Sequence, residues 1–265
     1  MPGRLQGKVA VITGNSTGIG RATSLTFQRE GATIVCSDLK EEAPDGSSTR
    51  ALIEQAGGKA IFVPCNVTKP SEVENLMDTA IKEYGRIDIL VCNAGIHGFS
   101  KEHGPGPIWE IDHSAWEASM SVNVYGVVHT LKYAIRHMIK QDPAADGKRG
   151  RIINLASIYG LVASTGASPY IAAKHAVSGL TKATALELAP HKIHCNAVSP
   201  GFTDTAFIAG QKDDIALWES INSKHPLGGI GQAQDIANMI LFMASEENTW
   251  MSGAVVPVDG GYTAQ

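Results

Sequence analysis

Short apolar runs alternate with longer stretches of helical pattern along the whole chain. The runs are rich in Val and Ile and mostly apolar on both faces, which is typical of parallel strands covered by helices on both sides. The predicted strands span residues 9–13, 33–38, 60–64, 87–93, 150–155, 192–197 and 254–258, and the predicted helices span residues 18–30, 48–56, 71–84, 114–140, 169–188 and 234–244. This alternation predicts an α/β fold, a doubly wound parallel sheet of about seven strands with helices on both faces.

Two stretches interrupt the alternation. Residues 96–112 contain the run Gly104-Pro105-Gly106-Pro107, and residues 202–229 lead from a Pro-Gly turn to a Gly-Gly pair. Both follow predicted strands, so they should lie beyond the carboxyl edge of the sheet, where such folds bind ligands. We interpret them as substrate loops of a single domain that spans residues 1–265; surface insertions without a role are the alternative.

The composition narrows the class of partner. Hydrophobic residues make up 43% and charged residues 18%, as in a compact core, and the net charge of −4 gives no reason to expect nucleic acid. No long apolar run precedes the first strand, so we expect no signal peptide, no membrane anchor and a cytoplasmic location. The cysteines are far apart and lie in or near predicted strands, which favours buried free thiols over disulfides or a metal site; they are Cys36, Cys65, Cys92 and Cys195.

A glycine-rich turn follows the first predicted strand and leads into a helix. It reads Thr13-Gly14-Asn15-Ser16-Thr17-Gly18-Ile19-Gly20, so its spacing is Gly-x-x-x-Gly-x-Gly. Glycine lets a ligand approach the backbone, and a helix N-terminus offers free N–H groups to a pyrophosphate. We predict a Rossmann-type dinucleotide site, with contacts from Gly14, Asn15, Thr17, Gly18, Ile19 and Gly20; a tight connection without a ligand is the alternative.

The second predicted strand ends at Asp38. A carboxylate at this place accepts hydrogen bonds from the ribose hydroxyls of adenosine and repels a 2′-phosphate. Leu39 follows, so no arginine stands there to neutralise such a phosphate, and Lys40 is interpreted as a surface charge. We predict NAD in preference to NADP, with Asp38 and Leu39 in contact with the cofactor.

Tyr170 and Lys174 lie four residues apart on a predicted helix, so both side chains face the same volume. A tyrosine ordinarily titrates at about pH 10, and a nearby ammonium group lowers that pKa. The pair therefore indicates a general acid/base with Lys174 as its electrostatic partner. Ser168 and Pro169 are expected to cap and begin this helix. The same spacing is common on exposed helices, so its meaning depends on the motifs around it.

Taken together, the motifs resemble those of the short-chain dehydrogenase/reductase family over nearly the whole chain. The further matches are Asn93-Ala94-Gly95, Asn123 in Ser121-Val122-Asn123-Val124, Ser157, Pro200-Gly201, Thr203 and Asp259-Gly260-Gly261. The resemblance implies a catalytic tetrad of Asn123, Ser157, Tyr170 and Lys174. It also implies cofactor contacts from Asn66, Val67, Asn93, Ala94, Gly95, Tyr170, Lys174, Pro200, Gly201 and Thr203.

The resemblance also implies a mechanism. Tyr170 removes the alcohol proton while a hydride passes to the nicotinamide, and Ser157 hydrogen-bonds the substrate oxygen. Lys174 lowers the tyrosine pKa and binds the nicotinamide ribose, and Asn123 holds a water that relays protons to solvent. Ketone reduction reverses these steps.

Three residues depart from the family pattern. Cys92 stands where a first asparagine is usual before Asn93, and Asn66 replaces the aspartate that reaches the adenine. An amide both donates and accepts, so we expect the adenine contact to survive. Lys192 occupies a helix-to-strand turn where the family favours glycine, and a positive φ there would carry strain of about 1 kcal/mol.

Substrate contacts are expected from Ser157 and Tyr170 and, in the long stretches, from His97, Phe202, Phe207 and Trp218. The apolar residues of 202–229 recur at helical spacing, which indicates a helix packed on the body or an apolar lid. His103 and His113 share the first stretch with His97, and their spacing fits no standard metal site. Small residues along the helix after Tyr170 imply, by resemblance, a homotetramer or homodimer.

The sequence thus predicts an oxidoreductase that transfers a hydride between NAD(H) and a secondary alcohol or ketone, with an apolar or cyclic substrate. The alternatives are a 3-oxoacyl-thioester reductase, a biosynthetic dehydrogenase of secondary metabolism and a catalytically silent nucleotide-sensing protein. NADPH use would favour the first of these, whereas the filled catalytic positions argue against the last.

Overall fold

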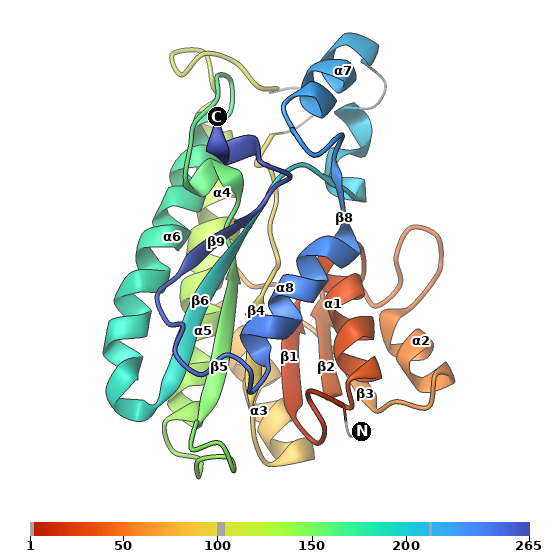
Figure 1. Cartoon of the computed structure of the whole chain (residues 1–265), viewed down its shortest axis with the longest axis vertical. Helices are drawn as coiled ribbons and strands as arrows, with labels where there is room; N and C mark the ends of the chain where they lie inside the picture. The colour runs from red at the N-terminus through yellow and green to blue at the C-terminus, as the bar shows by residue number, and fades with distance from the viewer. Residues whose placement is uncertain (1–2, 100–103, 212–213) are drawn as a thin grey trace.

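The computed structural model describes residues 3–99, 104–211 and 214–265, and its centre is a parallel sheet of seven strands (Figure 1). The strands are β1 (Val9–Thr13), β2 (Thr33–Asp38), β3 (Ala60–Pro64), β4 (Ile89–Cys92), β5 (Gly150–Leu155), β6 (Ile193–Pro200) and β9 (Val255–Val258). Their order is β3-β2-β1-β4-β5-β6-β9. The chain therefore builds one half of the sheet outward from β1 and returns to build the other half from β4, which confirms the predicted doubly wound sheet.

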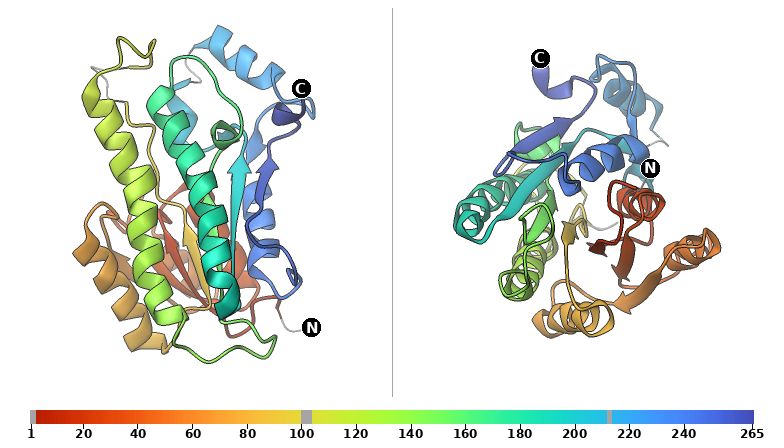
Figure 2. Two further views of the ribbon diagram at one scale, coloured as in Figure 1. Left: turned by 90° about the vertical axis from the view of Figure 1, so that its left-hand side faces the viewer. Right: turned by 60° about the horizontal axis from the view of Figure 1, so that its bottom comes forward.

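Helices cover both faces of this sheet (Figure 2). They are α1 (Gly18–Arg29), α2 (Thr49–Gln55), α3 (Pro70–Tyr84), α4 (His113–Met120), α5 (Gly126–Met138), α6 (Ser168–Leu188), α7 (Ile215–Ser223) and α8 (Ala233–Ala244). Alternate residues of β1 enter different cores: Val9 and Val11 pack with α3, α5 and α6, whereas Ala10 and Ile12 pack with α1, α2 and α8. This two-sided burial explains why the strands are apolar at nearly every position. All four cysteines are buried and free, as predicted.

The predicted boundaries differ from the structure by two residues or more at two strands. β4 begins two residues later than predicted, because the Asp88 side chain accepts a hydrogen bond from the Val9 amide at 2.9 Å. β6 continues three residues further, because its pairing with β9 runs on to the register pair Pro200 and Val258. Its end therefore lies at the carboxyl edge, where the Pro-Gly turn follows.

The helix predicted over residues 114–140 is interrupted. A π-helical turn (Ser121–Tyr125) separates α4 from α5 and contains Asn123. Such turns widen the helix by one residue and are frequent at functional sites. The Asn123 side chain accepts a hydrogen bond from the Ile96 amide at 3.0 Å and donates one to the Ile96 carbonyl at 2.8 Å. The turn therefore fixes the start of the loop after β4.

The start of α6 differs slightly from the prediction. Ala167 occupies the cap position, and Ser168 and Pro169 are the first two helical residues. No side chain caps the end, so the expected Ser168 cap is wrong. Pro169 still fits, because the first helical turn needs no donor from its own backbone nitrogen.

The stretch over residues 202–229 contains structure that the sequence left open. A two-stranded parallel sheet joins β7 (Thr203–Asp204) to β8 (Gly231–Gln232) and so closes the stretch at its base. A 3-10 helix (Ala206–Gln211) and α7 lie between them. In Figure 1, α7 stands above the carboxyl ends of the strands, which agrees with the predicted position.

Lys192 has a left-handed backbone with φ of 57° and is the one described non-glycine residue with positive φ. It ends the 3-10 turn (Ala189–His191) after α6, and its amide donates to the Ala189 carbonyl at 3.0 Å. The strain anticipated at this helix-to-strand turn is therefore present, since a Cβ atom crowds the following carbonyl in this conformation.

Replacing this exposed lysine should stabilise the protein. Lys192→Gly relieves about 1–2 kcal/mol of strain, and the greater freedom of glycine in the unfolded chain offsets about 0.5–1 kcal/mol of that gain. We expect a net rise of about 0.5–1 kcal/mol in the free energy of unfolding, measured by urea denaturation at fixed protein concentration. Lys192→Ala removes the same side chain but keeps the strain, so equal stability of the two variants would contradict this account.

Candidate active site

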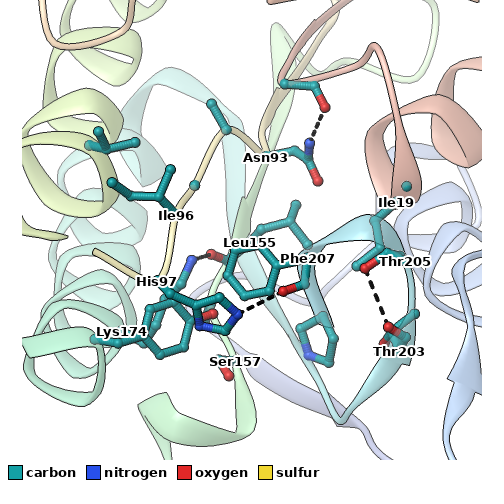
Figure 3. Close-up of a pocket in the computed structure, with 18 of the residues that line it drawn as sticks. Ile19, Asn93, Ile96, His97, Leu155, Ser157, Lys174, Thr203, Thr205 and Phe207 are labelled. Atoms are coloured by element: carbon teal, nitrogen blue, oxygen red, sulfur yellow. Dashed lines mark hydrogen bonds between the residues drawn. The ribbon is translucent and has the colours of Figure 1, made fainter. Parts of the chain in front are cut away.

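The carboxyl ends of β1, β2, β4, β5 and β6 surround one cavity of about 390 Å³ (Figure 3). It brings together most of the residues predicted from the sequence. Those that line it are Gly14, Thr17, Gly18, Ile19, Asp38, Leu39, Asn66, Val67, Asn93, Ala94, Gly95, His97, Ser157, Tyr170, Lys174, Pro200, Gly201, Phe202, Thr203 and Phe207. Residues more than 180 positions apart in the chain thus share one pocket, because parallel strands present their carboxyl ends at the same edge.

The glycine turn packs directly against the end of β4. A Cβ atom on Gly14 would lie 2.7 Å from the Ala94 Cα, and one on Gly20 would lie 2.2 Å from the Gly14 carbonyl oxygen. Only glycine fits at these two positions. The Asn93 side chain completes the contact, donating to the Gly14 carbonyl at 2.7 Å and to the Thr13 carbonyl at 3.0 Å. The Asn-Ala-Gly motif therefore holds the turn in its ligand-binding shape.

Two predicted cofactor residues lie beside the cavity and are not among the described residues that line it. Asn15 is buried, and its side-chain amide donates to the Ser24 hydroxyl at 3.4 Å. Gly20 is buried where α1 begins. Both residues shape the turn from behind, which a motif match cannot distinguish from direct contact.

Asp38 marks the outer end of the cavity. Its carboxylate accepts a hydrogen bond from the Ser16 amide at 3.1 Å and another from the Leu39 amide at 2.7 Å. A carboxylate has about four acceptor positions, so these bonds orient it and leave acceptors for a ligand. The Leu39 side chain is 66% exposed and lines the same end.

Asn66 lines the cavity next to this end. Its side-chain oxygen accepts from both the amide (3.0 Å) and the hydroxyl (2.8 Å) of Thr68. The oxygen is thereby oriented toward the turn, and the amide nitrogen of Asn66 offers donors to a ligand. The adenine contact of Asn66 stays a prediction, and its amide nitrogen is the group that could make it.

Ser157, Tyr170 and Lys174 form the inner end of the cavity, and all three side chains are buried. The Ser157 hydroxyl faces Tyr170 and acts to lower its pKa, and Ser157 Oγ accepts a hydrogen bond from the Tyr159 amide at 3.2 Å. The Lys174 ammonium donates to the Leu155 carbonyl at 2.8 Å, and its Nζ lies 5.5 Å from the centre of the Tyr170 ring (Figure 3). Ser157 and Leu155 come from the end of β5, whereas the other two come from α6.

Burial is the main cause of the pKa shifts of Tyr170 and Lys174. It raises the pKa of Tyr170 above its ordinary range, and the Ser157 hydroxyl acts in the opposite direction. Burial also lowers the pKa of Lys174 to about 8. The ammonium bonds the Leu155 carbonyl and lies over the tyrosine ring, and the lowering of the tyrosine pKa by Lys174 stays a prediction.

Asn123 is the one member of the predicted tetrad outside the described lining of the cavity. Its side chain is fully buried and holds the Ile96 backbone, as described above, and it also donates to the Ser119 hydroxyl at 3.1 Å. A Cβ atom on Gly95 would lie 2.9 Å from the Asn123 side-chain oxygen and 3.7 Å from Lys174 Nζ. Asn123 therefore lies close behind the lysine.

The region in front of Tyr170 is aromatic. His97, Phe202 and Phe207 line it as predicted, together with residues that the sequence analysis missed, which are Ile96, Tyr159, Thr205 and Ile208. Tyr159 is brought there by a 3-10 turn (Ile158–Gly160) directly after Ser157, and its ring meets that of Tyr170 edge-on. Because Tyr159 follows Ser157 by only two residues, the sequence alone could have indicated that it lies in the same site.

The remaining predicted residues lie elsewhere. Trp218 lies on α7 and is not among the described residues that line the cavity. His113 begins α4 with an exposed side chain, and His103 lies outside the described residues. The described ranges contain no group of three potential ligands suited to a metal ion. Nor, within them, is any helix sufficiently long and apolar to cross a membrane.

Comparison with known proteins places this geometry in a family. The family model described as enoyl-(acyl carrier protein) reductase matches residues 13–263. A cis-4-hydroxycyclohexanecarboxylate dehydrogenase of Sinomonas cyclohexanicum is 38% identical over 257 residues, which cover 97% of each chain. A 3-oxoacyl-(acyl-carrier-protein) reductase of Thermotoga maritima is 36% identical over 258 residues, covering 97% of this chain and 98% of that one.

Solved structures agree over the whole length. A short-chain type dehydrogenase/reductase from Mycobacterium marinum is 36% identical, with a TM-score of 0.88 and coverage of 98% and 97%. A carveol dehydrogenase from Mycobacterium avium in complex with NAD is 29% identical, with a TM-score of 0.89 and coverage of 99% and 100%. A putative 2-deoxy-D-gluconate 3-dehydrogenase from Agrobacterium tumefaciens with bound NADP is 30% identical, with a TM-score of 0.84 and coverage of 98% of each chain. The chain therefore belongs to the short-chain dehydrogenase/reductase family.

Proposed function

We propose that this protein is an NAD-dependent dehydrogenase that transfers a hydride between NAD(H) and an apolar or cyclic secondary alcohol or ketone. The observation that carries the proposal is the meeting of the buried Ser157, Tyr170 and Lys174 at the inner end of a cavity whose outer end is Asp38. The glycine turn, with helix α1 behind it, lies between the two ends and suits a pyrophosphate. A dinucleotide bound along this cavity, with its adenosine at Asp38, would have its nicotinamide beside Tyr170.

The proton and the hydride of the alcohol pass to two different acceptors. In oxidation Tyr170 takes the hydroxyl proton, and the hydride on the carbinol carbon passes to the nicotinamide, which supplies the electron acceptor when bound. Ser157 donates a hydrogen bond to the substrate oxygen and stabilises the charge that develops there. Because the tyrosine pKa is raised by burial, the phenolate needs a positive neighbour, and the cationic form of Lys174 supplies it.

Asp38 supports the preference for NAD. Its oriented carboxylate can accept from ribose hydroxyls, whereas a 2′-phosphate would meet a like charge. The structural neighbours include one complex with NAD and one with NADP, so the preference rests on Asp38 and on the apolar Leu39 next to it.

The lining around Tyr170 supports an apolar or cyclic substrate. Rings of Tyr159, Phe202, Phe207 and His97 face this space, and such faces bind hydrocarbon rings well. One relative is named for a hydroxylated cyclohexane acid. The rival activity, reduction of a 3-oxoacyl thioester, is favoured by the name of the Thermotoga relative. Turnover of an acetoacetyl thioester with NADPH, and none of cyclohexanol with NAD, would select that rival.

We further propose a homotetramer, or a homodimer, in the cytoplasm. β9 is an edge strand of the sheet, and Trp250 in the segment before it and Leu186 on α6 are 94% and 78% exposed. Large exposed apolar side chains beside an unpaired edge favour association. Light scattering at micromolar concentration measures the mass directly, and a monomer of 28.0 kDa would refute the proposal.

Removing the phenol should separate catalysis from binding. Tyr170→Phe keeps the ring and its packing but deletes the proton acceptor, so kcat for cyclohexanol oxidation should fall by about 10²–10⁴-fold. The Kd for NADH, measured by fluorescence titration, should change less than about twofold. Substantial residual turnover would show that Tyr170 is not the acid/base.

Replacing Asp38 and Leu39 should change the cofactor preference. Asp38→Ser with Leu39→Arg removes the repulsive carboxylate and adds a donor for a phosphate, and a charge-assisted hydrogen bond contributes about 1.5–3 kcal/mol. The ratio of kcat/KM for NAD to that for NADP should fall by about 10–100-fold in steady-state kinetics. Leu39→Ala, which keeps Asp38, is the control and should retain the wild-type preference.

The buried lysine should reduce stability in a pH-dependent way. Below about pH 8 Lys174 is charged in both the folded and unfolded states, and above about pH 10.5 it is neutral in both. The drop in its pKa corresponds to about 3 kcal/mol of desolvation that the folded state bears at neutral pH. Lys174→Met should therefore be more stable than wild type by about 2–3 kcal/mol at pH 7, and the difference should shrink as pH rises from 8 to 10.5.

Urea denaturation at a series of pH values measures this difference directly. Lys182→Met, an exposed lysine on the same helix, is the matched control and should show no such trend. A pH-independent difference for Lys174→Met would contradict the assigned cause.

A further inference from the structure

His97 joins the two long stretches in front of the catalytic tyrosine. It lies two residues after the Asn-Ala-Gly motif, and its ring packs against those of both Phe207 and Tyr170, with centroid distances of 3.7 Å and 5.4 Å. Its Nε2 lies 2.9 Å from the Phe207 carbonyl oxygen (Figure 3). A carbonyl only accepts, so this nitrogen carries the proton. One side chain thus makes both a ring contact and a directional bond to the same residue.

Phe207 lines the cavity near Tyr170 and is partly exposed to solvent. Its side chain is 39% exposed, and its ring is 6.0 Å from that of Tyr170. A partly exposed phenyl ring has few neighbours, so its position depends on each of the contacts that it makes. The two His97 contacts are therefore important for keeping it over the tyrosine.

The segment that carries Phe207 is anchored at its base. Thr203 and Asp204 pair with β8, and the methyl group of Thr205 lies next to Gly18, where a Cβ atom would approach to 3.2 Å. These contacts fix the segment up to Thr205. Beyond that point, the chain is held by the buried Ile208, whose amide donates to the Thr205 carbonyl at 3.2 Å, and by His97, which bonds the Phe207 carbonyl (Figure 3).

We propose that His97 is a positioning residue that clamps Phe207 over Tyr170 and thereby sets the size of alcohol the enzyme prefers. Held in this place, the Phe207 ring is a surface against which the six-membered ring of a substrate packs while the substrate oxygen reaches Tyr170 and Ser157. A three-carbon alcohol is too short to contact the Phe207 ring at the same time. The proposal rests on the proposed function, since it assumes that Tyr170 receives a substrate hydroxyl.

The bond survives protonation of His97, because Nε2 keeps its hydrogen in either form. Burial and the nearby charge of Lys174 lower the pKa of His97, so its ring is neutral at pH 7. His97 variants should therefore leave the pH profile of oxidation unchanged, in contrast to variants of the acid/base group. This separates a clamp from a proton donor.

The test compares cyclohexanol with 2-propanol as substrates of the full-length protein. A hydrogen bond and an aromatic contact each correspond to about a 2–10-fold effect. His97→Ala loses both contacts, so kcat/KM for cyclohexanol should fall by about 10-fold or more, mainly through KM, and by less than about twofold for 2-propanol. His97→Phe keeps a ring and should lose less. The exposed His113→Ala is the matched control and should behave as wild type.

A double-mutant cycle with Phe207→Ala tests the pairing. Once Phe207 is alanine, the ring contact is absent, so the loss from His97→Ala should shrink several-fold. Equal losses for both alcohols, or strictly additive losses in the cycle, would overturn the clamp and indicate general damage to the fold.

A measurement without substrate keeps this proposal separate from the proposed function. Amide hydrogen exchange of residues 206–208 should be about 10-fold faster in His97→Ala than in wild type, and unchanged in His113→Ala. Unchanged exchange would overturn the clamp even in an active enzyme. Faster exchange in a protein that oxidises neither alcohol would support the clamp and refute the proposed substrate class.

Discussion

The burial of Tyr170 and Lys174 side by side is the constraint on which the rest of the site depends. A phenol and an amine removed from water both resist ionisation, and burial moves their pKa values in opposite directions. Chemistry at neutral pH requires that they be kept within reach of each other and of a hydroxyl donor. Helix α6 supplies the pair one turn apart, and the end of β5 supplies Ser157 and the Leu155 carbonyl that holds the ammonium.

This constraint explains why the surrounding elements are so closely connected. The π-helical turn places Asn123 behind the lysine, and Asn123 in turn fixes the loop after β4 through the Ile96 backbone. The same loop holds Asn93 against the glycine turn. A dinucleotide site and an acid/base site are thus parts of one hydrogen-bonded structure, so a shift in either affects the other.

The sequence predicted what local pattern determines. Strand burial on both faces, the glycine spacing and the Tyr-x-x-x-Lys interval are short-range features, and the structure places nearly all of them as expected. Features that depend on tertiary contacts were missed. The break in the helix around Asn123 and the short strands near Thr203 produce no periodic pattern of hydrophobic residues in the sequence. Whether the Asn15 side chain faces the ligand or Ser24 depends on tertiary packing. Trp218 was chosen for its apolar character and its helical spacing, and neither determines whether a side chain of α7 lines the cavity.

The small sheet between β7 and β8 has an evolutionary consequence. Because Thr203 and Gly231 pair, the intervening segment begins and ends at neighbouring points, so its length and sequence can change without moving β6 or α8. Loop closure at such a base adds little cost when the segment grows. Changes within this segment can therefore alter the substrate range without a change in the sheet or the buried lysine, provided that its contacts with Gly18 and His97 are kept.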